Sequence, residues 1–137
     1  GDRPVNRALC QVDPDGRLTG IVEGAVHVGG NGGLTWRPIG ASEDEALVMK
    51  GDEPVSMNLW GFTPDILPVF TEAFAAFERS GAIAAGEELF LPNVVGQHLG
   101  PATGLAVTVL VTDAHCLGVT HPDDVPLLQA TLPGPAW

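Results

Sequence analysis

The first hydrophobic and polar pattern along the chain predicts a β-hairpin. Residues 6–12 (NRALCQV) and 17–23 (RLTGIVE) are apolar-rich runs, and residues 13–16 (DPDG) separate them. Proline fixes φ at the second position of a turn, and glycine accepts a positive φ at its end. A glycine cluster at 29–33 (GGNGG) precedes a segment, 34–38 (LTWRP), that does not look helical. We therefore expect a second hairpin tip there rather than a phosphate-binding loop.

Two later runs are almost wholly apolar and predict strands that are buried on both faces of a sheet. They are residues 55–62 (VSMNLWGF) and 105–112 (LAVTVLVT). Between them, a helix is expected to begin at 63–65 (TPD) and to lay an aromatic stripe on the sheet, because apolar residues recur at helical spacing. A second helix is expected from Pro92 to Leu99. The residues of the aromatic stripe are Ile66, Phe70, Phe74 and Phe77.

The C-terminal part adds one more strand and one more helix. Residues 115–119 (HCLGV) predict a strand, and residues 120–123 (THPD) place a capping threonine and a proline at the start of a helix that runs through Leu132. The predicted order is a hairpin, then strand, helix, helix, strand, strand and helix. This order predicts an α/β fold, with a mixed sheet and flanking helices, in one domain over residues 1–137.

The composition narrows the function classes. Six Lys and Arg stand against seventeen Asp and Glu, so the formal net charge of the 137 residues is −11. Nucleic-acid binding requires clustered cations, and this chain lacks them. It also has no apolar run long enough to span a bilayer and no signal-peptide pattern, so we expect a cytoplasmic protein with no membrane partner. Cys10 and Cys116 are expected to be reduced, buried thiols rather than a disulfide.

Two places could carry chemistry. Asn58 interrupts an apolar run, and Glu23 ends another; together they could bind the hydroxyls of a small polar ligand, or they could be a satisfied structural amide and a surface carboxylate. Asp123 and Asp124 could bind a divalent cation through oxygen, or they could complement the first turn of a helix. The motifs of α/β-hydrolases, zinc proteases and P-loop proteins are absent.

Four motifs, in this order and at these distances, resemble the C-terminal half of the sugar-phosphate nucleotidyltransferases, a glycosyltransferase-A-like family. The resemblance covers nearly the whole chain and implies the C-terminal part of a nucleotide-diphospho-sugar transferase (Rossmann-like) fold. The motifs are residues 13–23 (DPDGRLTGIVE), 55–62 (VSMNLWGF), 87–92 (EELFLP) and 117–124 (LGVTHPDD).

The resemblance also implies roles for individual residues. Glu23 and Asn58 match the acid and the amide that hold sugar hydroxyls, and Ala8 stands where the family has a glycine whose backbone approaches the sugar. The turn after Val119 would approach the phosphates and Mg²⁺. Thr120 takes the position at which the family often has Asn or Asp, and Asp123 or Asp124 could substitute as the metal ligand.

The implied reaction joins a nucleoside triphosphate to a sugar 1-phosphate or a similar phosphorylated acceptor and releases pyrophosphate. The family holds the triphosphate with an N-terminal Gly-rich signature, an Arg and a Lys, none of which this chain contains. We therefore expect the acceptor-binding half of a longer enzyme, inactive by itself. The alternative is a non-catalytic binding or assembly module that keeps part of the transferase fold and covers an open sheet edge by forming a homo-oligomer.

Overall fold

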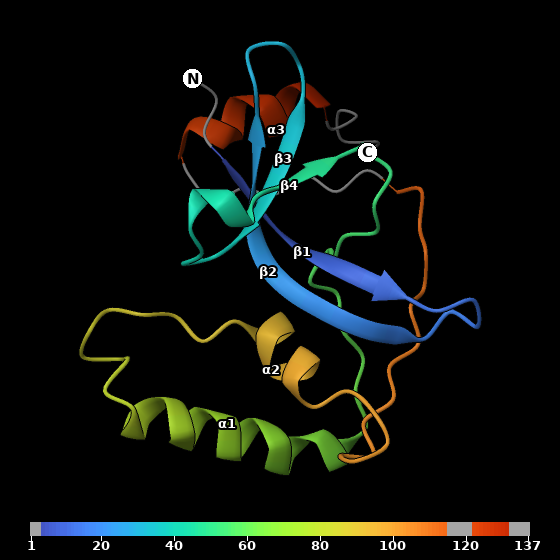
Figure 1. Cartoon of the computed structure of the whole chain (residues 1–137), viewed down its shortest axis with the longest axis vertical. Coiled ribbons are helices and arrows are strands. Elements are labelled where there is room, and N and C mark those ends of the chain that lie inside the picture. Colours follow the sequence, from blue (N-terminus) through green and yellow to red (C-terminus); the bar gives the residue numbers. More distant parts are fainter. Residues whose placement is uncertain (1–3, 115–121, 132–137) are drawn as a thin grey trace, which may run out of the picture.

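A four-stranded antiparallel sheet is the centre of a mixed α/β fold (Figure 1). The computed structural model describes residues 4–114 and 122–131. The strands lie in the order of the sequence, β1-β2-β3-β4, and all three pairings are antiparallel. The α/β class is confirmed, but the sheet of the described residues is not the predicted mixed one, and it does not confirm a Rossmann-like transferase fold. They are β1 (Val5–Val12), β2 (Leu18–Val28), β3 (Leu34–Pro38) and β4 (Leu47–Met49). The helices are α1 (Leu67–Arg79), α2 (Leu91–Gln97) and α3 (Val125–Thr131), with short 3₁₀ turns η1 (Glu43–Glu45), η2 (Pro64–Ile66) and η3 (Pro122–Asp124).

Both predicted hairpin turns are confirmed. In the first, the Asp13 carboxylate accepts hydrogen bonds from the backbone N–H groups of Asp15 at 3.0 Å and Arg17 at 2.8 Å. Gly16 completes this turn at φ 79°, a conformation that glycine adopts without steric cost. The second tip joins β2 to β3, and it is closed by a 2.8 Å bond from the Gly29 N–H to the Gly33 carbonyl oxygen. Residues close in sequence determine both turns.

The short helix α2 packs directly on β2. Its Asn93 side-chain oxygen accepts a hydrogen bond from the backbone N–H of Glu23 at 2.8 Å. One turn further along, a β-carbon at Gly96 would overlap the carbonyl oxygen of Ile21, so only glycine allows helix and strand backbones to approach this closely. The hydrophobic core lies at this contact. Its buried members are Ala8, Leu18, Ile21 and Val95.

The prediction of a strand at residues 55–62 is wrong. Only Val55 pairs with the sheet, in an isolated bridge to Leu9 of β1. Three residues later Asn58 has φ 54°, which is a left-handed conformation that a regular strand does not contain. Leu59, which follows, is 92% exposed. The apolar composition is that of a buried strand, but after Ser56 the segment makes no further backbone hydrogen bond to β1 or to another described strand.

The prediction of a buried central strand at residues 105–112 is also wrong. The segment meets the first hairpin at one isolated pair, Arg17 with Thr108. Two backbone bonds hold it there: Leu18 N–H to the Val107 carbonyl at 2.9 Å, and Val109 N–H to the Gly16 carbonyl at 2.8 Å. Beyond this pair, Leu110 and Val111 are each 88% exposed. The β-branched sequence favours an extended backbone, but burial also requires a second neighbour.

The predicted aromatic helix is confirmed as α1, preceded by η2, but its stripe does not lie on the sheet. Figure 1 shows α1 apart from the strands, with α2 between it and β2. Phe70 packs edge-on against Phe62, with ring centroids 5.3 Å apart, and Phe62 stacks on Trp60 at 5.5 Å. Phe74 is exposed. The stripe therefore covers an extended loop rather than a sheet face. The second predicted helix is confirmed as α2.

The C-terminal predictions are tested only in part. The predicted last helix is seen as η3 and α3, while the strand predicted at 115–119 and the residues Thr120 and Leu132 lie outside the described ranges. Cys10 is a free, half-buried thiol, as expected, and burial raises its pKa. Cys116 lies outside the described residues. Within the described ranges, no helix is long and apolar enough to cross a membrane.

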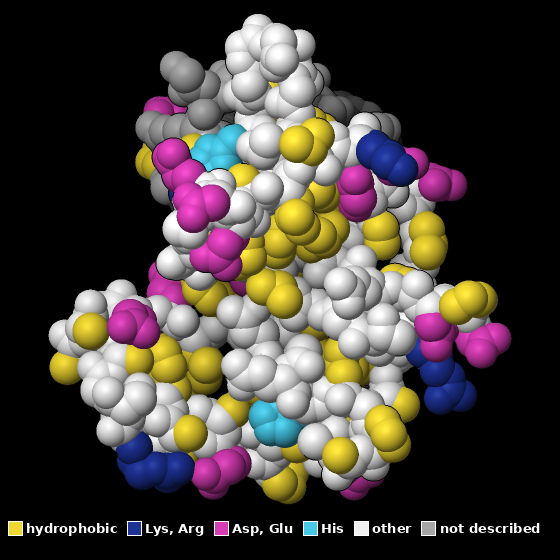
Figure 2. All heavy atoms as spheres, viewed as in Figure 1, with side chains coloured by type: hydrophobic (Ala, Val, Ile, Leu, Met, Phe, Trp, Pro, Cys, Tyr) yellow, Lys and Arg dark blue, Asp and Glu magenta, His cyan; other side chains and the backbone are white. Residues whose placement is uncertain are grey.

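Large hydrophobic side chains are exposed at many places on the described part of the chain. On the face drawn in Figure 2, hydrophobic side chains gather near the middle of the molecule. Exposed aliphatic residues occur on β1, β2, α1 and several loops, but the most exposed lie on β4 and on the two extended segments that fail to form strands. The most exposed of them are Val48, Leu59, Leu110 and Val111.

Candidate functional site

Glu23 is a buried carboxylate on the central part of β2. Its residue is 5% exposed, and its side chain lies on the same face as Ile21, which faces α2. Its backbone is fully used: the N–H donates to Asn93, and the carbonyl accepts the N–H of Ile39 at 3.1 Å. Within the described residues, the carboxylate itself accepts no hydrogen bond. Solvent still reaches the carboxylate oxygens, because the one described side-chain atom that is buried without a partner is the Trp60 indole nitrogen. An acid in so buried a residue marks a candidate site.

The electrostatic setting of Glu23 favours its neutral form. Burial raises the pKa of the Glu23 carboxyl above its ordinary value, and the positive charge of Arg7 opposes the rise. Desolvation is the larger of the two effects, because burial removes part of the water that would hydrate a charged carboxylate. A ligand that donates hydrogen bonds in place of that water would favour the charged form.

Ala8 lies on β1, the strand next to Glu23, and Asn58 lies on the segment that meets the other edge of β1. Ala8 of β1 is the direct cross-strand partner of Glu23, so the two side chains share a face, and the Ala8 methyl group is part of the hydrophobic core. The Ala8 carbonyl accepts the N–H of Ser56 at 2.9 Å. Asn58 follows Ser56 by two residues and is exposed, and its N–H donates to the Ser56 hydroxyl at 3.1 Å. The three predicted sugar-binding residues therefore come from three adjacent segments.

The predicted metal ligands are not gathered into a site. Asp123 and Asp124 lie in the single turn η3, immediately before α3, and each takes part in an interaction in the structure. Thr120 is outside the described residues. Across the part of the chain that the structure describes, no three His, Cys, Asp or Glu side chains are grouped as a metal ion would need. These residues do not by themselves fit a Mg²⁺ site.

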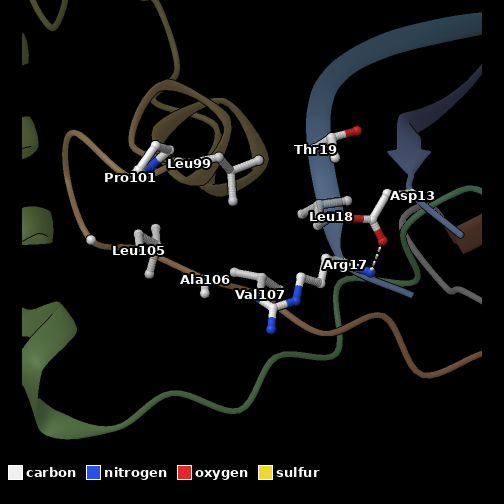
Figure 3. A pocket seen from close by; sticks show the side chains of 11 residues that line it. Asp13, Arg17, Leu18, Thr19, Leu99, Pro101, Leu105, Ala106 and Val107 are labelled. Carbon is white, nitrogen blue, oxygen red and sulfur yellow. Dashed lines mark hydrogen bonds between the residues drawn. The ribbon is translucent and has the colours of Figure 1, made fainter. Parts of the chain in front are cut away.

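Two hollows in the surface lie away from Glu23 and Asn58. The first, of about 420 Å³, lies between the start of β2, the end of α2 and residues 104–107. Figure 3 shows the Arg17 side chain beside Val107 at this hollow, and the bond from its backbone N–H to Asp13. The second hollow, of about 510 Å³, lies between residues 61–63 and the segment 104–110. Neither hollow is lined by a predicted sugar-binding residue.

Sequence reasoning missed Asn93 and Gly96. Both lie on α2 and hold that helix against β2, and Asn93 supplies the hydrogen bond that fixes the backbone of Glu23. Hydrophobic periodicity does not identify either residue, because neither has an apolar side chain. The only local signal was their position after Pro92, in the short helix that follows residues 87–91.

Comparison with known proteins adds no relative. No family model matches the chain, and no curated protein matches it.

Proposed function

We propose that this chain is the acceptor-binding part of a sugar-phosphate nucleotidyltransferase, in which Glu23 and Asn58 bind hydroxyl groups of the acceptor sugar. The proposal rests on the resemblance of four motifs in this order and at these distances. In such an enzyme the acceptor phosphate attacks the α-phosphorus of the nucleotide in line, and no protein nucleophile is needed. A net charge of −11 does not suit triphosphate binding, so that task belongs to groups outside these 137 residues.

The observation that carries the proposal is the Glu23 carboxylate. The residue is buried, the pKa of its carboxyl is raised, and the carboxylate, which solvent still reaches, accepts no hydrogen bond from the described residues. Sugar hydroxyls are donors of the required kind. A hydrogen bond to a charged acceptor contributes about 1.5–3 kcal/mol, more than one to a neutral acceptor. Asn58, on the segment that bonds to the carbonyl of Ala8, would contribute an amide from the other side of β1.

Mg²⁺ enters the proposal only as the metal of the complete reaction. The described carboxylates do not form a site for it, so we assign no step of the reaction to a metal bound by this chain. We expect the chain by itself to release no pyrophosphate from a nucleoside triphosphate and a sugar 1-phosphate.

Ligand-detected NMR tests acceptor binding directly. Glucose 1-phosphate and N-acetylglucosamine 1-phosphate, each titrated with the chain, should show saturation transfer to the sugar ring protons. Glu23→Gln keeps the shape of the side chain but removes its charge, and it should weaken binding by about fivefold to tenfold. Glu53→Gln is the matched control, because the Glu53 carboxylate is bonded to the backbone N–H groups of Lys50 and Gly51 in an exposed turn.

Inorganic phosphate separates sugar recognition from simple anion binding. If it displaces the sugar phosphates at equal concentration, the sugar is not recognised and the proposal is refuted. The same holds if Glu23→Gln and Glu53→Gln bind the sugar phosphates with equal affinity.

A second candidate, a binding or assembly module without catalytic activity, is favoured by the amount of exposed surface. Val48, Leu59, Leu110 and Val111 are each 85–92% exposed, and exposed apolar surface is a feature of interaction sites. Assembly and acceptor binding would use different parts of the molecule.

A further inference from the structure

Two extended segments face one another across the second hollow. Residues 61–63 line one side, and residues 104–108 with Leu110 line the other. We call this hollow, of about 510 Å³, the slot. Ile66 and Val69, which begin the helical region after residue 63, also line it, so its walls are mostly apolar. Asp65 is its one ionisable lining residue.

Part of the backbone on both sides of the slot lacks hydrogen-bond partners within the described chain. At the Arg17–Thr108 pair, the bonds to the hairpin are made by Val107 and Val109. In an antiparallel pair, successive residues direct their N–H and C=O groups to opposite edges. Thr108, and by the same alternation Ala106 and Leu110, therefore direct theirs away from the hairpin. Among residues 4–114 and 122–131, these groups have no backbone partner.

The segment on the opposite side of the slot also has unpaired backbone groups. No backbone hydrogen bond is made by residues 59–62 to any other part of the described chain. Trp60 even buries its indole N–H without an acceptor. Leu59, Gly61, Ala106, Thr108 and Leu110 are exposed, so only water competes for their unpaired backbone groups, which are open to pairing with an added strand. An extended polypeptide placed between two such segments would satisfy both, as a strand does at an open sheet edge.

The geometry points to the slot as the acceptor of a β-strand, supplied by an apolar polypeptide segment that carries basic residues at its ends and lies outside these 137 residues. The unpaired N–H and C=O groups on both sides specify an extended backbone. The apolar walls specify alternating aliphatic side chains. Asp65 at the slot and the net charge of −11 specify a cationic rather than an acidic partner, and they disfavour a second copy of this chain. The inference does not depend on the proposed sugar site.

The test uses a synthetic peptide of alternating valine and threonine with two lysines at each end. Amide hydrogen exchange of the whole chain, followed by NMR, should show slower exchange at Ala106, Thr108 and Leu110 when the peptide is bound. The same peptide with a central proline should bind at least about tenfold more weakly, because proline removes a donor from the ladder. The version with glutamates in place of lysines should also bind more weakly.

Variants of the chain identify the edge. Thr108→Pro removes the outward N–H but leaves the bonds of Val107 and Val109 in place, and it should weaken peptide binding by at least about tenfold. If Thr108→Pro fails to fold, Leu110→Lys addresses the same edge from a side chain that is 88% exposed. It should weaken binding of the lysine-flanked peptide by about tenfold. Val48→Lys on β4 is the matched control, because Val48 is 85% exposed and does not line the slot.

Three results would overturn the inference. One is the absence of protection at residues 106, 108 and 110 with saturating peptide. Another is a loss of binding in Val48→Lys that equals or exceeds the loss in Leu110→Lys. The third is self-association in sedimentation equilibrium that Leu110→Lys abolishes and Val48→Lys does not, because the occupant would then be a second copy. Failure of sugar-phosphate binding would leave all three measurements unchanged.

Discussion

Gly96 is the position at which one methyl group should separate a helix from the sheet. A β-carbon there would overlap the carbonyl oxygen of Ile21 and would lie 3.3 Å from the Ile21 Cγ2 atom. Neither can move freely, because Ile21 is a buried member of β2 and Val95, beside Gly96, is completely buried. In Gly96→Ala, therefore, α2 itself has to move away from the strand.

Two opposing terms set the size of the effect. Alanine in place of glycine stabilises a helix interior by about 1 kcal/mol. Overpacking a close contact costs about 1–3 kcal/mol, and moving α2 also stretches the bond between Asn93 and the N–H of Glu23, which contributes about 1 kcal/mol. The net expectation is a destabilisation of about 2 kcal/mol. With an unfolding entropy of about 2.1 cal/mol/K per residue, this lowers the Tm by about 7 °C.

Thermal unfolding followed by near-ultraviolet circular dichroism measures this shift. Gly30→Ala is the matched control, because a β-carbon at Gly30 meets no atom within 4 Å and its φ is not positive. We expect that variant to unfold within about 0.5 kcal/mol of the parent chain. A Gly96→Ala variant as stable as Gly30→Ala, or more stable than the parent, would refute the packing of α2 described above.

Two other perturbations test the surroundings of Glu23. Because burial raises the pKa of Glu23 in the folded chain, its stabilising contribution is present below the unfolded pKa, about 4.3, and is lost as the pH rises through the folded value. Urea titrations should show Glu23→Gln gaining stability relative to the parent from about pH 4 toward neutrality, and a constant difference would contradict this. Asn93→Ala removes the acceptor for the Glu23 N–H, and the same titration should show a loss of about 1–2 kcal/mol in the free energy of unfolding. Asn93→Asp keeps an oxygen at this position and adds a negative charge, which should raise the pKa of Glu23 further. An unchanged pH profile in Asn93→Asp would show that residues 93 and 23 are not close together.

The parts of the fold that could be predicted are those in which neighbours in sequence decide the structure. The turn at Asp13 and Gly16 is held by bonds that span at most four residues, so its residue types were sufficient. The helices α1 and α2 likewise follow from local spacing and from proline at their beginnings. Hydrophobic periodicity indicates which residues avoid water. A helix can be predicted from it because a helix makes its own backbone hydrogen bonds, whatever it packs against.

The strands predicted at 55–62 and 105–112 show what such reasoning leaves out. Their composition indicates burial, but a strand also requires a second backbone beside it, and composition does not state whether that backbone is present. Asn58 was identified as the odd residue of its run, yet its left-handed conformation was not anticipated. The apolar composition of each segment was therefore a poor guide to its pairing.

The candidate site likewise contains one residue that the sequence could predict and one that it could not. Glu23 could be identified because it is an acid at the end of an apolar run, and its burial agrees with a special role. Asn93 could not, because its bond to Glu23 joins residues 70 positions apart. The contact depends on how α2 is placed on β2, and that placement in turn depends on Gly96. Such a contact is decided by tertiary packing, which a pattern along one chain does not encode.

The uncovered segments at 59–62 and 105–112 also govern how the chain behaves in concentrated solution. Both combine unpaired backbone with exposed aliphatic side chains, which is the composition of aggregation-prone edges. At neutral pH the net charge of −11 keeps separate molecules apart. Near the isoelectric point, about pH 4.4, the net charge passes through zero and this repulsion disappears. The acidic surface therefore keeps the chain dispersed at neutral pH. Acidification to this pH should turn a clear solution into a light-scattering one with cross-β order.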